Sequence, residues 1–554
     1  MNRREFLKLS ALALGGAVAE GRHAFAQVRQ NADLAFVGGP VVTMDSALPE
    51  AEAVAVKAGR VLLVGTQAQV QAVCDRGTQM VDLAGRTLTP GLIDAHSHLG
   101  PFGQMELYFV KIRPPAVHDF ASLRQALADA ARRLPRGAWI VARGFNEFDE
   151  ERFPCRWEID EATPNNPVLA IHWTGQYGVA NTLGLQQANL LSADAPDPYG
   201  GKYLRDRNGL PDGRLLHYPA IYAVYQPKMT SEEEYRAVVW GAQRFIEQGV
   251  TCVHDNFASQ HSGLAYVQAE RRGDLPLHLR LYPYVANLQH CQQMVQRLNR
   301  YHGPLVRVQG IKLAVDGYPL MYDVLPQHRQ INIPMHPEDQ FRAIVATIHN
   351  AGLQVDVHAA GDRGVDLTLE AFSRAAGGDA AVRSRRHRLE HYMFYRQQSI
   401  DRTAAMGVPV CTQPAWIDMR AADMVRKLGS KPVEKMVPLG SFHEAGVAIC
   451  FGADVCASPT HLPLDSIIPA VRRDPPGNVR LDPSERLTFM QALQAHTITS
   501  AYAAFDEQDM GSITKGKLAD LAVWQGDLRQ VNEDNVADQK VVATYVGGKR
   551  VWQA

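Results

Sequence analysis

Short apolar runs alternate with amphipathic segments through the middle of the chain. Of the amphipathic segments, one opens with Ser231 and Glu234 spaced as a capping box, and another runs from Pro337 to Gly352. Strands that alternate with helices in this way predict a parallel sheet covered by helices. The apolar runs end near His98, Asp255, Val285, Asp316, His358, His391, Pro414 and Asp454. Eight such strands predict an α/β fold, a (β/α)8 TIM barrel over residues 89–504.

The two ends of the chain have a different pattern. Between about Asp33 and Asp82, β-branched residues alternate with polar ones in short runs broken by Gly, and the same pattern returns near the C-terminus. Residues 27–88 and 505–554 are therefore predicted to pair into one small β domain, with two independent flaps as the alternative. The interval of about 99–249, after the first barrel strand, is too long for a single crossover and is predicted to be an insertion.

Residues 1–26 have the features of an export signal. The adjacent Arg3 and Arg4 precede a short apolar stretch at 9–19, and a small-x-small cleavage pattern follows at 24–26. The stretch is shorter than the roughly 20 residues that a membrane helix needs, and the paired arginines resemble a twin-arginine signal. We expect a periplasmic or otherwise exported protein without stable membrane insertion, whose partner is the twin-arginine export machinery. An ordinary secretory signal or an N-terminal anchor is the alternative.

Composition narrows the class of protein. Apolar residues make up 46% of the chain and charged residues 21%, as in soluble globular enzymes. The net charge is −1, and removal of the signal would take away four basic and two acidic side chains. This near-neutral balance gives no electrostatic reason to expect a nucleic-acid partner, so a small-molecule substrate is expected. A homo-oligomer is kept as an alternative to a monomer. The seven cysteines are scattered and form no disulfide framework or thiolate zinc site by spacing, although one bridge remains open.

Two histidines end the first barrel strand. Side chains alternate across a strand, so Asp94, His96 and His98 project to one face, which in a barrel is the interior. Two neutral imidazoles at this spacing can bind one cation of zinc type, and Asp94 could orient one of the rings. The histidine pair by itself is weak support for a metal site, because many such pairs are surface or core histidines.

Ligand-type residues also end three later strands. His358, His391 and Asp454 occupy the same position in their strands as the first pair, and barrel active sites lie at this end. The sequence therefore predicts a shared metal site. Lys312 lies between apolar neighbours, where a free ammonium is costly to bury. Either its head group reaches solvent, or its amine is carboxylated by carbon dioxide and becomes an anionic ligand between two metals.

Several motifs together resemble one known family. They are PGLIDAHSHLG, GIKLAVDG, VHAAGD, RHRLEH, FGAD and the closing GSITKGKLADLAV. They are similar to the amidohydrolase superfamily, in particular its amidohydrolase 3 branch with N-substituted formamide deformylase-like enzymes. The resemblance covers nearly all of the mature chain and implies a metal-dependent barrel with a β-sandwich. It also implies six ligands for two zinc ions: His96 and His98 on the more buried one, His358 and His391 on the more exposed one, carboxylated Lys312 as the bridge, and Asp454.

Substrate contacts are harder to predict. Where relatives in this branch commonly have Gly-His in the insertion, this chain has Gly175-Gln176. Gln176 thus stands at the position of a substrate contact. Arg143 and Arg420 are candidate anchors for a carboxylate or carbonyl. Aromatic residues of the insertion and the strand-end loops, Tyr318 and Trp416 among them, are candidates for an apolar pocket, with core packing as the alternative.

The predicted reaction follows from these parts. A bound metal lowers the pKa of water, and a carboxylate such as Asp454 can act as general base and then as general acid toward a leaving nitrogen. We expect hydrolysis of an amide- or formamide-type carbon–nitrogen bond. One alternative is a deaminase or cyclic-amide hydrolase with one metal and an unmodified Lys312. The other is a non-catalytic periplasmic binding protein.

Overall fold

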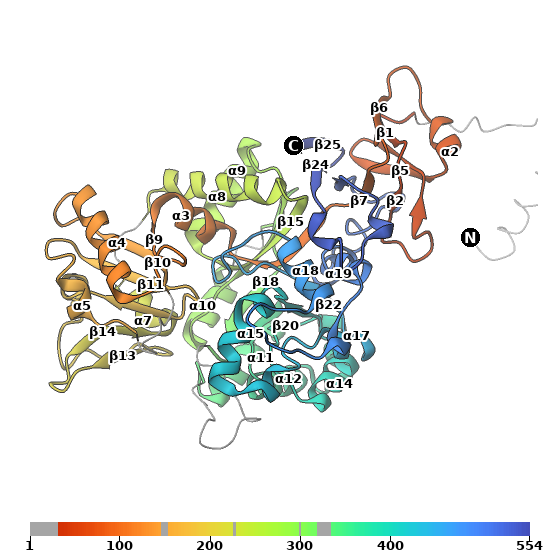
Figure 1. Cartoon of the computed structure of the whole chain (residues 1–554). Helices are drawn as coiled ribbons and strands as arrows, with labels where there is room; N and C mark the ends of the chain where they lie inside the picture. Colours follow the sequence, from red (N-terminus) through yellow and green to blue (C-terminus); the bar gives the residue numbers. More distant parts are fainter. Residues whose placement is uncertain (1–30, 146–152, 225–228, 299–300, 318–333) are drawn as a thin grey trace, which may run out of the picture.

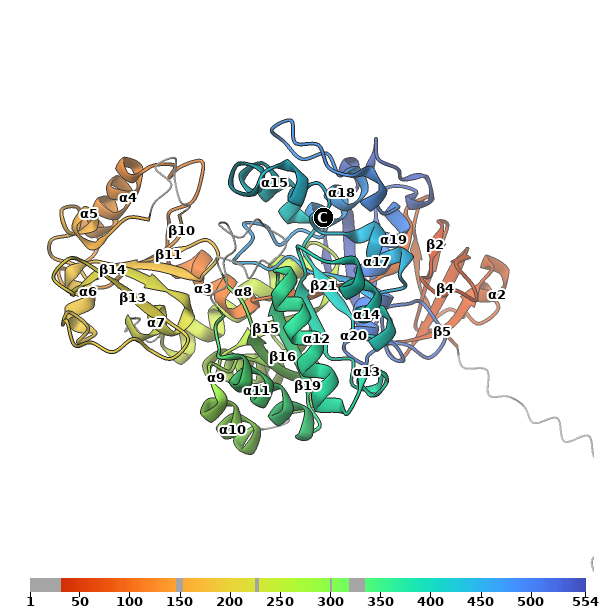
Figure 2. The ribbon, with the colours of Figure 1, turned by 90° about the horizontal axis from the view of Figure 1, so that it is seen from below.

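The computed structural model describes residues 31–145, 153–224, 229–298, 301–317 and 334–554. The predicted export signal, residues 1–26, and the predicted substrate contact Tyr318 lie outside these ranges. Three parts follow one another across the molecule: an insertion with its own sheet, a central barrel, and a β-sandwich that contains strands from both ends of the chain (Figures 1 and 2).

Eight parallel strands form the central barrel. In chain order they are β8 (Leu92–Ser97), β15 (Val250–Ala258), β16 (His278–Pro283), β17 with β18 (Val306–Val308 and Gly310–Ala314), β19 (Gln354–Ala359), β20 (Arg388–His391), β21 (Val410–Thr412) and β22 (Ile449–Phe451). The two halves of the fourth strand join two sheets, because β17 pairs with β16 and β18 pairs with β19. On the opposite side, the Asp454 amide donates to the His96 carbonyl at 2.8 Å, which connects the last strand to the first. The barrel is therefore closed, and the predicted (β/α)8 fold is confirmed.

Helices cover the outside of the barrel (Figure 2). They include α3 (Leu99–Tyr108), α8 (Ser231–Ile246), α9 (Gln260–Arg272), α10 (Leu288–Arg297), α11 (Glu338–Asn350), α12 (Asp362–Ala376), α14 (Gln397–Met406), α15 (Ala415–Leu428), α17 (Leu439–Glu444), α18 (Leu464–Arg472), α19 (Phe489–Ala495) and α20 (Ile498–Ala503). In α11 the buried residues Phe341, Ile344, Val345 and Ile348 recur at helical spacing, so one face joins the barrel core. The capping box of α8 pairs Thr230 with Glu233, one residue before the predicted pair.

Strands from both chain ends build the β-sandwich. One sheet contains β1 (Leu34–Val37), β4 (Ala53–Lys57), β5 (Arg60–Gly65) and β6 (Gln79–Asp82). The other contains β2 (Val41–Val42), β3 (Glu50–Ala51), β7 (Thr87–Pro90), β23 (Leu521–Trp524), β24 (Val541–Val546) and β25 (Lys549–Gln553). The antiparallel pairing of β7 with β23 joins the two ends, and Phe36 packs edge-on against Tyr545 at 5.0 Å between ring centroids. This confirms the sandwich as part of the fold class, while the exact domain boundaries stay predictions.

The insertion has its own six-stranded sheet. Its strands are β9 (Val110–Lys111), β10 (Ile140–Phe145), β11 (Val168–His172), β12 (Tyr177–Ala180), β13 (Lys202–Arg205) and β14 (Pro211–Leu216), and its helices are α4 (Phe120–Arg133), α5 (Arg156–Asp160), α6 (Thr182–Gln187) and α7 (His217–Val224). Helices α3 and α8, near the two ends of the predicted insertion, contribute Leu99, Phe102 and Phe245 to the barrel core. The sheet lies to one side of the barrel (Figure 1). Side chains of β10 and of the β11–β12 turn line one cavity together with residues of the barrel.

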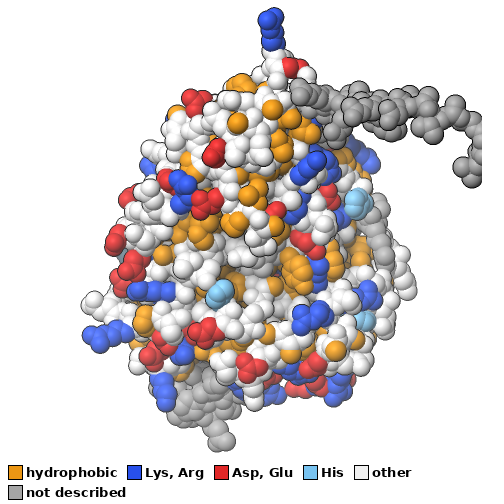
Figure 3. Space-filling view, turned by 90° about the vertical axis from the view of Figure 1, so that its right-hand side faces the viewer, with side chains coloured by type: hydrophobic (Ala, Val, Ile, Leu, Met, Phe, Trp, Pro, Cys, Tyr) orange, Lys and Arg blue, Asp and Glu red, His pale blue; other side chains and the backbone are white. Residues whose placement is uncertain are grey.

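No helix in the described ranges has the length and apolar character needed to cross a bilayer. The face in Figure 3 carries lysines and arginines interspersed with acidic residues. All seven cysteines are free, so the disulfide bridge that the sequence left open does not form.

Gly452 is expected to be intolerant of a side chain where the barrel closes. A Cβ atom there would lie 2.4 Å from the amide nitrogen of His96 and 2.6 Å from its carbonyl oxygen. Both are backbone atoms, so the first and last strands would have to separate. We expect Gly452→Ala to lower the free energy of unfolding by about 1–3 kcal/mol, as overpacked core positions do, and to reduce activity.

A matched control is Gly263→Ala on α9, where nothing lies within 4 Å of an added Cβ. This variant should leave stability unchanged or raise it by up to about 1 kcal/mol, because Ala favours the helix. Denaturant unfolding of the two variants beside the wild-type protein checks both expectations. Equal stability of the two variants would contradict the close approach at Gly452.

Candidate metal centre

A single cavity opens at the carboxyl ends of the barrel strands and collects all six predicted ligands. Its lining includes His96, His98, Lys312, His358, His391 and Asp454. The predicted contacts Arg143, Gln176, Trp416 and Arg420 line it as well. The six predicted ligands, widely separated in the chain, meet there because each lies in or just after a strand of the same barrel.

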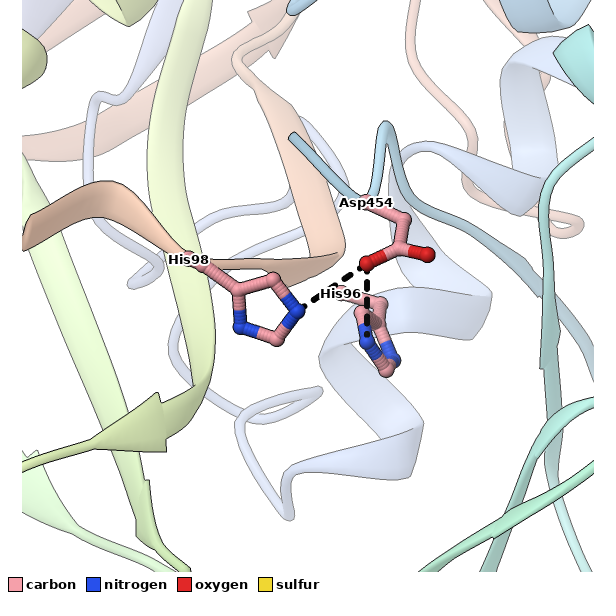
Figure 4. Close-up of side chains that lie close together, drawn as sticks. All are labelled: His96, His98 and Asp454. Atoms are coloured by element: carbon pink, nitrogen blue, oxygen red, sulfur yellow. Dashed lines mark ion pairs between the residues drawn. The ribbon is translucent and has the colours of Figure 1, made fainter. Parts of the chain in front are cut away.

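His96, His98 and Asp454 form the tightest group (Figure 4). The Asp454 Oδ1 atom lies 3.0 Å from His98 Nε2 and 3.5 Å from His96 Nε2. One ligand-type atom from each of the three residues lies within 4.8 Å of the others. The spacing that the alternation along β8 predicted is thus present, with Asp454 brought to it by the chain after β22.

The other two histidines lie beside this group. The ring centroid of His391 is 4.7 Å from that of His96 and 4.2 Å from that of His358. His391 stacks on Trp416, and its Nδ1 atom lies 2.8 Å from Gln413 Oε1, which fixes the ring orientation. His358 Nε2 faces the Asp316 carboxylate at 3.5 Å. All four imidazoles therefore converge on one region of the cavity.

Glu390 supports the ring of His96, and sequence reasoning missed it. Its Oε2 atom hydrogen-bonds His96 Nδ1, which leaves His96 Nε2 directed toward Asp454, while its Oε1 accepts from Arg388 Nε at 2.9 Å. The residue lies within the RHRLEH motif, next to His391. Alternation would place neighbours on opposite faces, but β20 ends at His391, whose φ is +78°, so both side chains approach His96.

The proposed role of Asp94 is corrected. Its carboxylate does not orient a histidine ring, because its two oxygens accept the backbone amides of His96 and Ala453, both at 3.1 Å. Asp94 thus ties the first barrel strand to the segment after the last one. Burial raises the pKa of this carboxyl to about 7, against the opposing effect of the two backbone hydrogen bonds.

Lys312 is buried on β18, with only 4% of its surface exposed. Its Nζ atom lies 3.0 Å from Asp356 Oδ1, and the other oxygen of Asp356 accepts from Asn256. The head group does not reach bulk solvent but points into the cavity beside the histidines. The snorkelling alternative is thereby excluded, whereas carboxylation of this amine stays a prediction.

The electrostatics of the group suit a cation held by neutral imidazoles. Burial lowers the pKa of His98 and of His358, and it lowers that of His391 to about 3. Burial would raise the pKa of Asp454, but hydrogen bonds with His96 and His98 hold it well below its usual value. Neutral imidazole and ionised carboxylate are the forms that bind metal.

Two further observations fit a metal. Burial and the charge of Lys312 act to lower the pKa of His96, yet Glu390 and Asp454 outweigh them and raise it, so positive charge is favoured at this ring. The buried atom His358 Nε2 has no hydrogen-bond partner within the described part of the chain, although the Asp316 carboxylate lies 3.5 Å away. Such groups in a native structure call for an explanation, and a divalent ion bound by nitrogen and oxygen donors provides one.

The cavity wall contains the predicted Gln176 and also residues that the sequence analysis did not name. Gln176 Oε1 lies 3.2 Å from His217 Nδ1, whereas the nearby His172 bonds Thr174 and does not line the cavity. Four aromatic residues of the wall were missed: Tyr218, Tyr222, Phe257 and Tyr284. Phe257 and Tyr284 lie at strand ends, which is a signal the sequence carried, but the approach of α7 to the barrel depends on how the insertion docks.

Comparisons with known proteins agree with this geometry. The sequence profile described as "Amidohydrolase family" matches residues 79–552. The protein LONG AFTER FAR-RED 3 of Arabidopsis thaliana is 30% identical over 94% of this chain and 92% of its own length. The N-substituted formamide deformylase of Arthrobacter pascens is 27% identical over 94% of this chain and 98% of its own. A metal-dependent hydrolase of Pyrococcus horikoshii has the same fold, with a TM-score of 0.71 and 20% identity, over 90% of this chain and 99% of that one.

Proposed function

The chain belongs to the amidohydrolase family, and from that premise we propose that it hydrolyses an amide- or formamide-type carbon–nitrogen bond in a small molecule at a divalent metal centre. The observation that carries the proposal is the convergence of His96, His98 and Asp454 in a cavity at the carboxyl end of the barrel. The name of the formamide deformylase relative supports this bond type. Family membership makes the protein a hydrolase that acts on carbon–nitrogen bonds.

The ligands would divide between two ions, which we propose are zinc. His96, His98 and Asp454 would hold one ion, and His358 and His391 the other. When bound, zinc lowers the pKa of water to about 7 and polarises the carbonyl group to be attacked. Nitrogen and oxygen donors of this kind are typical of catalytic zinc sites, which keep a position open for water or substrate.

Asp454 would move the proton. Its carboxylate takes a proton from the attacking water, whose oxygen bonds to the carbonyl carbon. When the carbon–nitrogen bond breaks, the electron pair stays on nitrogen and Asp454 returns the proton there, so an amide and water become an acid and an amine. Glu390 and Gln413 hold the rings of His96 and His391 in the orientation this requires.

Lys312 would bridge the two ions as a carbamate formed from carbon dioxide. As an ammonium, Lys312 repels a neighbouring cation. Burial acts to lower the pKa of His96, His358 and His391, and the positive charge of Lys312 acts in the same direction. Carboxylation replaces this positive charge by a negative oxygen ligand. The contact of Lys312 with Asp356 favours the second candidate, in which Lys312 stays an ammonium and one metal serves a deaminase or cyclic-amide hydrolase.

Metal analysis and native mass spectrometry separate these candidates. We expect two zinc ions per chain and the added mass of one carbon dioxide, absent from Lys312→Met. We also expect a chelator to abolish hydrolysis of N-formyl and N-acyl compounds, and zinc to restore it. One metal per chain with no added mass would favour the mononuclear alternative. A zinc-loaded protein that hydrolyses no compound of the panel would contradict the proposed reaction.

Export remains a proposal that rests on the sequence of residues 1–26 alone. We propose a periplasmic or otherwise exported location, reached through the twin-arginine machinery after folding. A protein that binds its metals before export suits this route.

A further inference from the structure

The wall of the cavity beyond the metal ligands carries buried hydrogen-bond donors that have no partner in the described structure. They are the Nε atom of Arg143, the indole Nε1 atoms of Trp173 and Trp416, and the hydroxyl of Tyr284. Arginine and indole nitrogens can only donate. No buried carboxylate or amide oxygen of the described lining residues lacks a partner in the same way. The cavity wall therefore offers hydrogen-bond donors to a ligand that carries acceptors.

Arg143 adds a positive charge to these unpartnered hydrogen-bond donors. Several arginines elsewhere in the insertion have carboxylate partners: Arg113 faces Glu106 at 3.3 Å, and Arg214 pairs with Asp212. Arg143, half-buried on β10, has no such partner among the described residues, and the only acid of the described lining is Asp454. Because Asp454 is engaged by His96 and His98, no carboxylate of the described lining is left to balance the guanidinium.

The surroundings fix where Arg143 lies. A Cβ atom at Gly175 would come within 3.0 Å of Arg143 Nη2, and the φ of Gly175 is +73°, so a glycine there lets the guanidinium lie against the β11–β12 turn. Tyr218 packs against Phe257, which stacks on Tyr284 with centroids 4.5 Å apart. Burial raises the pKa of Tyr218 and Tyr284, so both hydroxyls stay protonated and able to donate. The charge thus stands beside an aromatic wall.

We propose that Arg143 forms a carboxylate subsite and that the substrate is an N-formyl or N-acyl amino acid whose side chain is aromatic or otherwise apolar. The planar guanidinium matches a carboxylate with two parallel hydrogen bonds. The aromatic wall receives the side chain, and the amide group reaches the metal centre. This inference rests on the proposed function, because it assigns the substrate class of the same site.

Two substrates that differ only in the carboxylate test the inference. They are racemic N-formylphenylalanine and N-(2-phenylethyl)formamide, which share the formamide and the aromatic ring. We expect the zinc-loaded wild-type protein to favour the first by about 10- to 100-fold in kcat/KM, the loss expected for a charge-assisted hydrogen-bonded pair. The ratio should fall to near one in Arg143→Met and lie between the two in Arg143→Lys, which keeps the charge but not the fork.

Arg132→Met is the matched control, because Arg132 lies on α4 of the same insertion with 67% of its side chain exposed. It should keep the wild-type preference. A wild-type ratio near one, or a ratio unchanged by Arg143→Met, would overturn the carboxylate subsite even if both formamides are hydrolysed.

Calorimetry separates failure of the subsite from failure of the proposed reaction. The probes are 3-phenylpropanoate and its neutral amide, bound to the same zinc-loaded proteins. Tighter binding of the carboxylate, lost by about 10-fold or more in Arg143→Met, supports the subsite even if no formamide is hydrolysed. Carboxylate binding that is equal in the wild type and Arg143→Met would place the anion on the metal and overturn the inference.

Discussion

Asp454→Asn is expected to lower kcat/KM by about 100- to 10,000-fold, the range for loss of a positioned general base and acid. Asparagine keeps the shape of the side chain and one oxygen that can face the histidines, but it cannot accept a proton from water or return one to nitrogen. Asp454 suits the role because hydrogen bonds with His96 and His98 keep it ionised despite complete burial. The measurement is steady-state hydrolysis of an N-formyl substrate by zinc-loaded protein.

The zinc content of the variant decides whether its loss of activity is assigned to proton transfer or to metal binding. If Asp454→Asn keeps its zinc and its melting temperature while activity falls, the loss belongs to proton transfer. The same substitution at Asp401, an exposed residue of α14, should leave turnover within about 2-fold, because surface substitutions rarely change stability by more than about 0.5 kcal/mol. Turnover by Asp454→Asn equal to wild type would contradict the assignment and favour the non-catalytic alternative.

The barrel and the meeting of the proposed ligand residues could be predicted because both depend on local pattern. The predicted strand ends at His98, His358 and His391 fall within one residue of the observed ends of β8, β19 and β20. Apolar runs bounded by turns mark buried parallel strands, and the topology of a barrel then brings their carboxyl ends together. Asp454 follows the same rule, since it comes just after β22.

The support around the ligands could not be predicted in the same way, because it depends on pairings across the barrel. Glu390 faces His96 from another strand, while Asp94, expected to face a ring, binds backbone amides instead. Positive φ angles at His391 and Asp454 interrupt the alternation that sequence reasoning extends through strand ends. Residues at active sites often occupy such conformations, and local propensity gives no sign of them.

The cavity wall shows a second limit of prediction from the sequence. Arg143 was a candidate by residue type and Gln176 by its position in the family pattern. Both line the cavity, but their surroundings come from the docking of a separate sheet onto the barrel. Tyr218 belongs to α7 of that insertion and packs against Phe257 of β15. No periodicity in either segment specifies this contact, because it joins two independently built layers.

Arg388 holds the centre of the barrel together beneath the metal site, and its replacement should have the largest effect on stability. The side chain is fully buried and donates to Glu390 Oε1, to His254 Nδ1 at 3.0 Å and to the Ala95 carbonyl at 2.6 Å. Burial would raise the pKa of Glu390, but the charge of Arg388 and that of His96 hold it well below its usual range. The pair therefore stays ionised where neither charge has access to water.

Arg388→Met should lower the free energy of unfolding by about 3–5 kcal/mol, because it leaves a buried carboxylate without its main partner. Zinc affinity should fall as well, since Glu390 would no longer be held against His96. In the double variant Arg388→Met with Glu390→Gln, no charge is stranded, so part of the stability should return although the support of His96 does not.

Arg374→Met is the control: Arg374 is 67% exposed and paired with Glu370, and exposed pairs contribute about 1 kcal/mol or less. Denaturant unfolding and zinc titration of the four proteins measure both effects. Equal destabilisation by Arg388→Met and the control would show that the buried pair contributes no more than a surface one, and a double variant no more stable than Arg388→Met would place the cost in the lost arginine contacts rather than in the stranded charge.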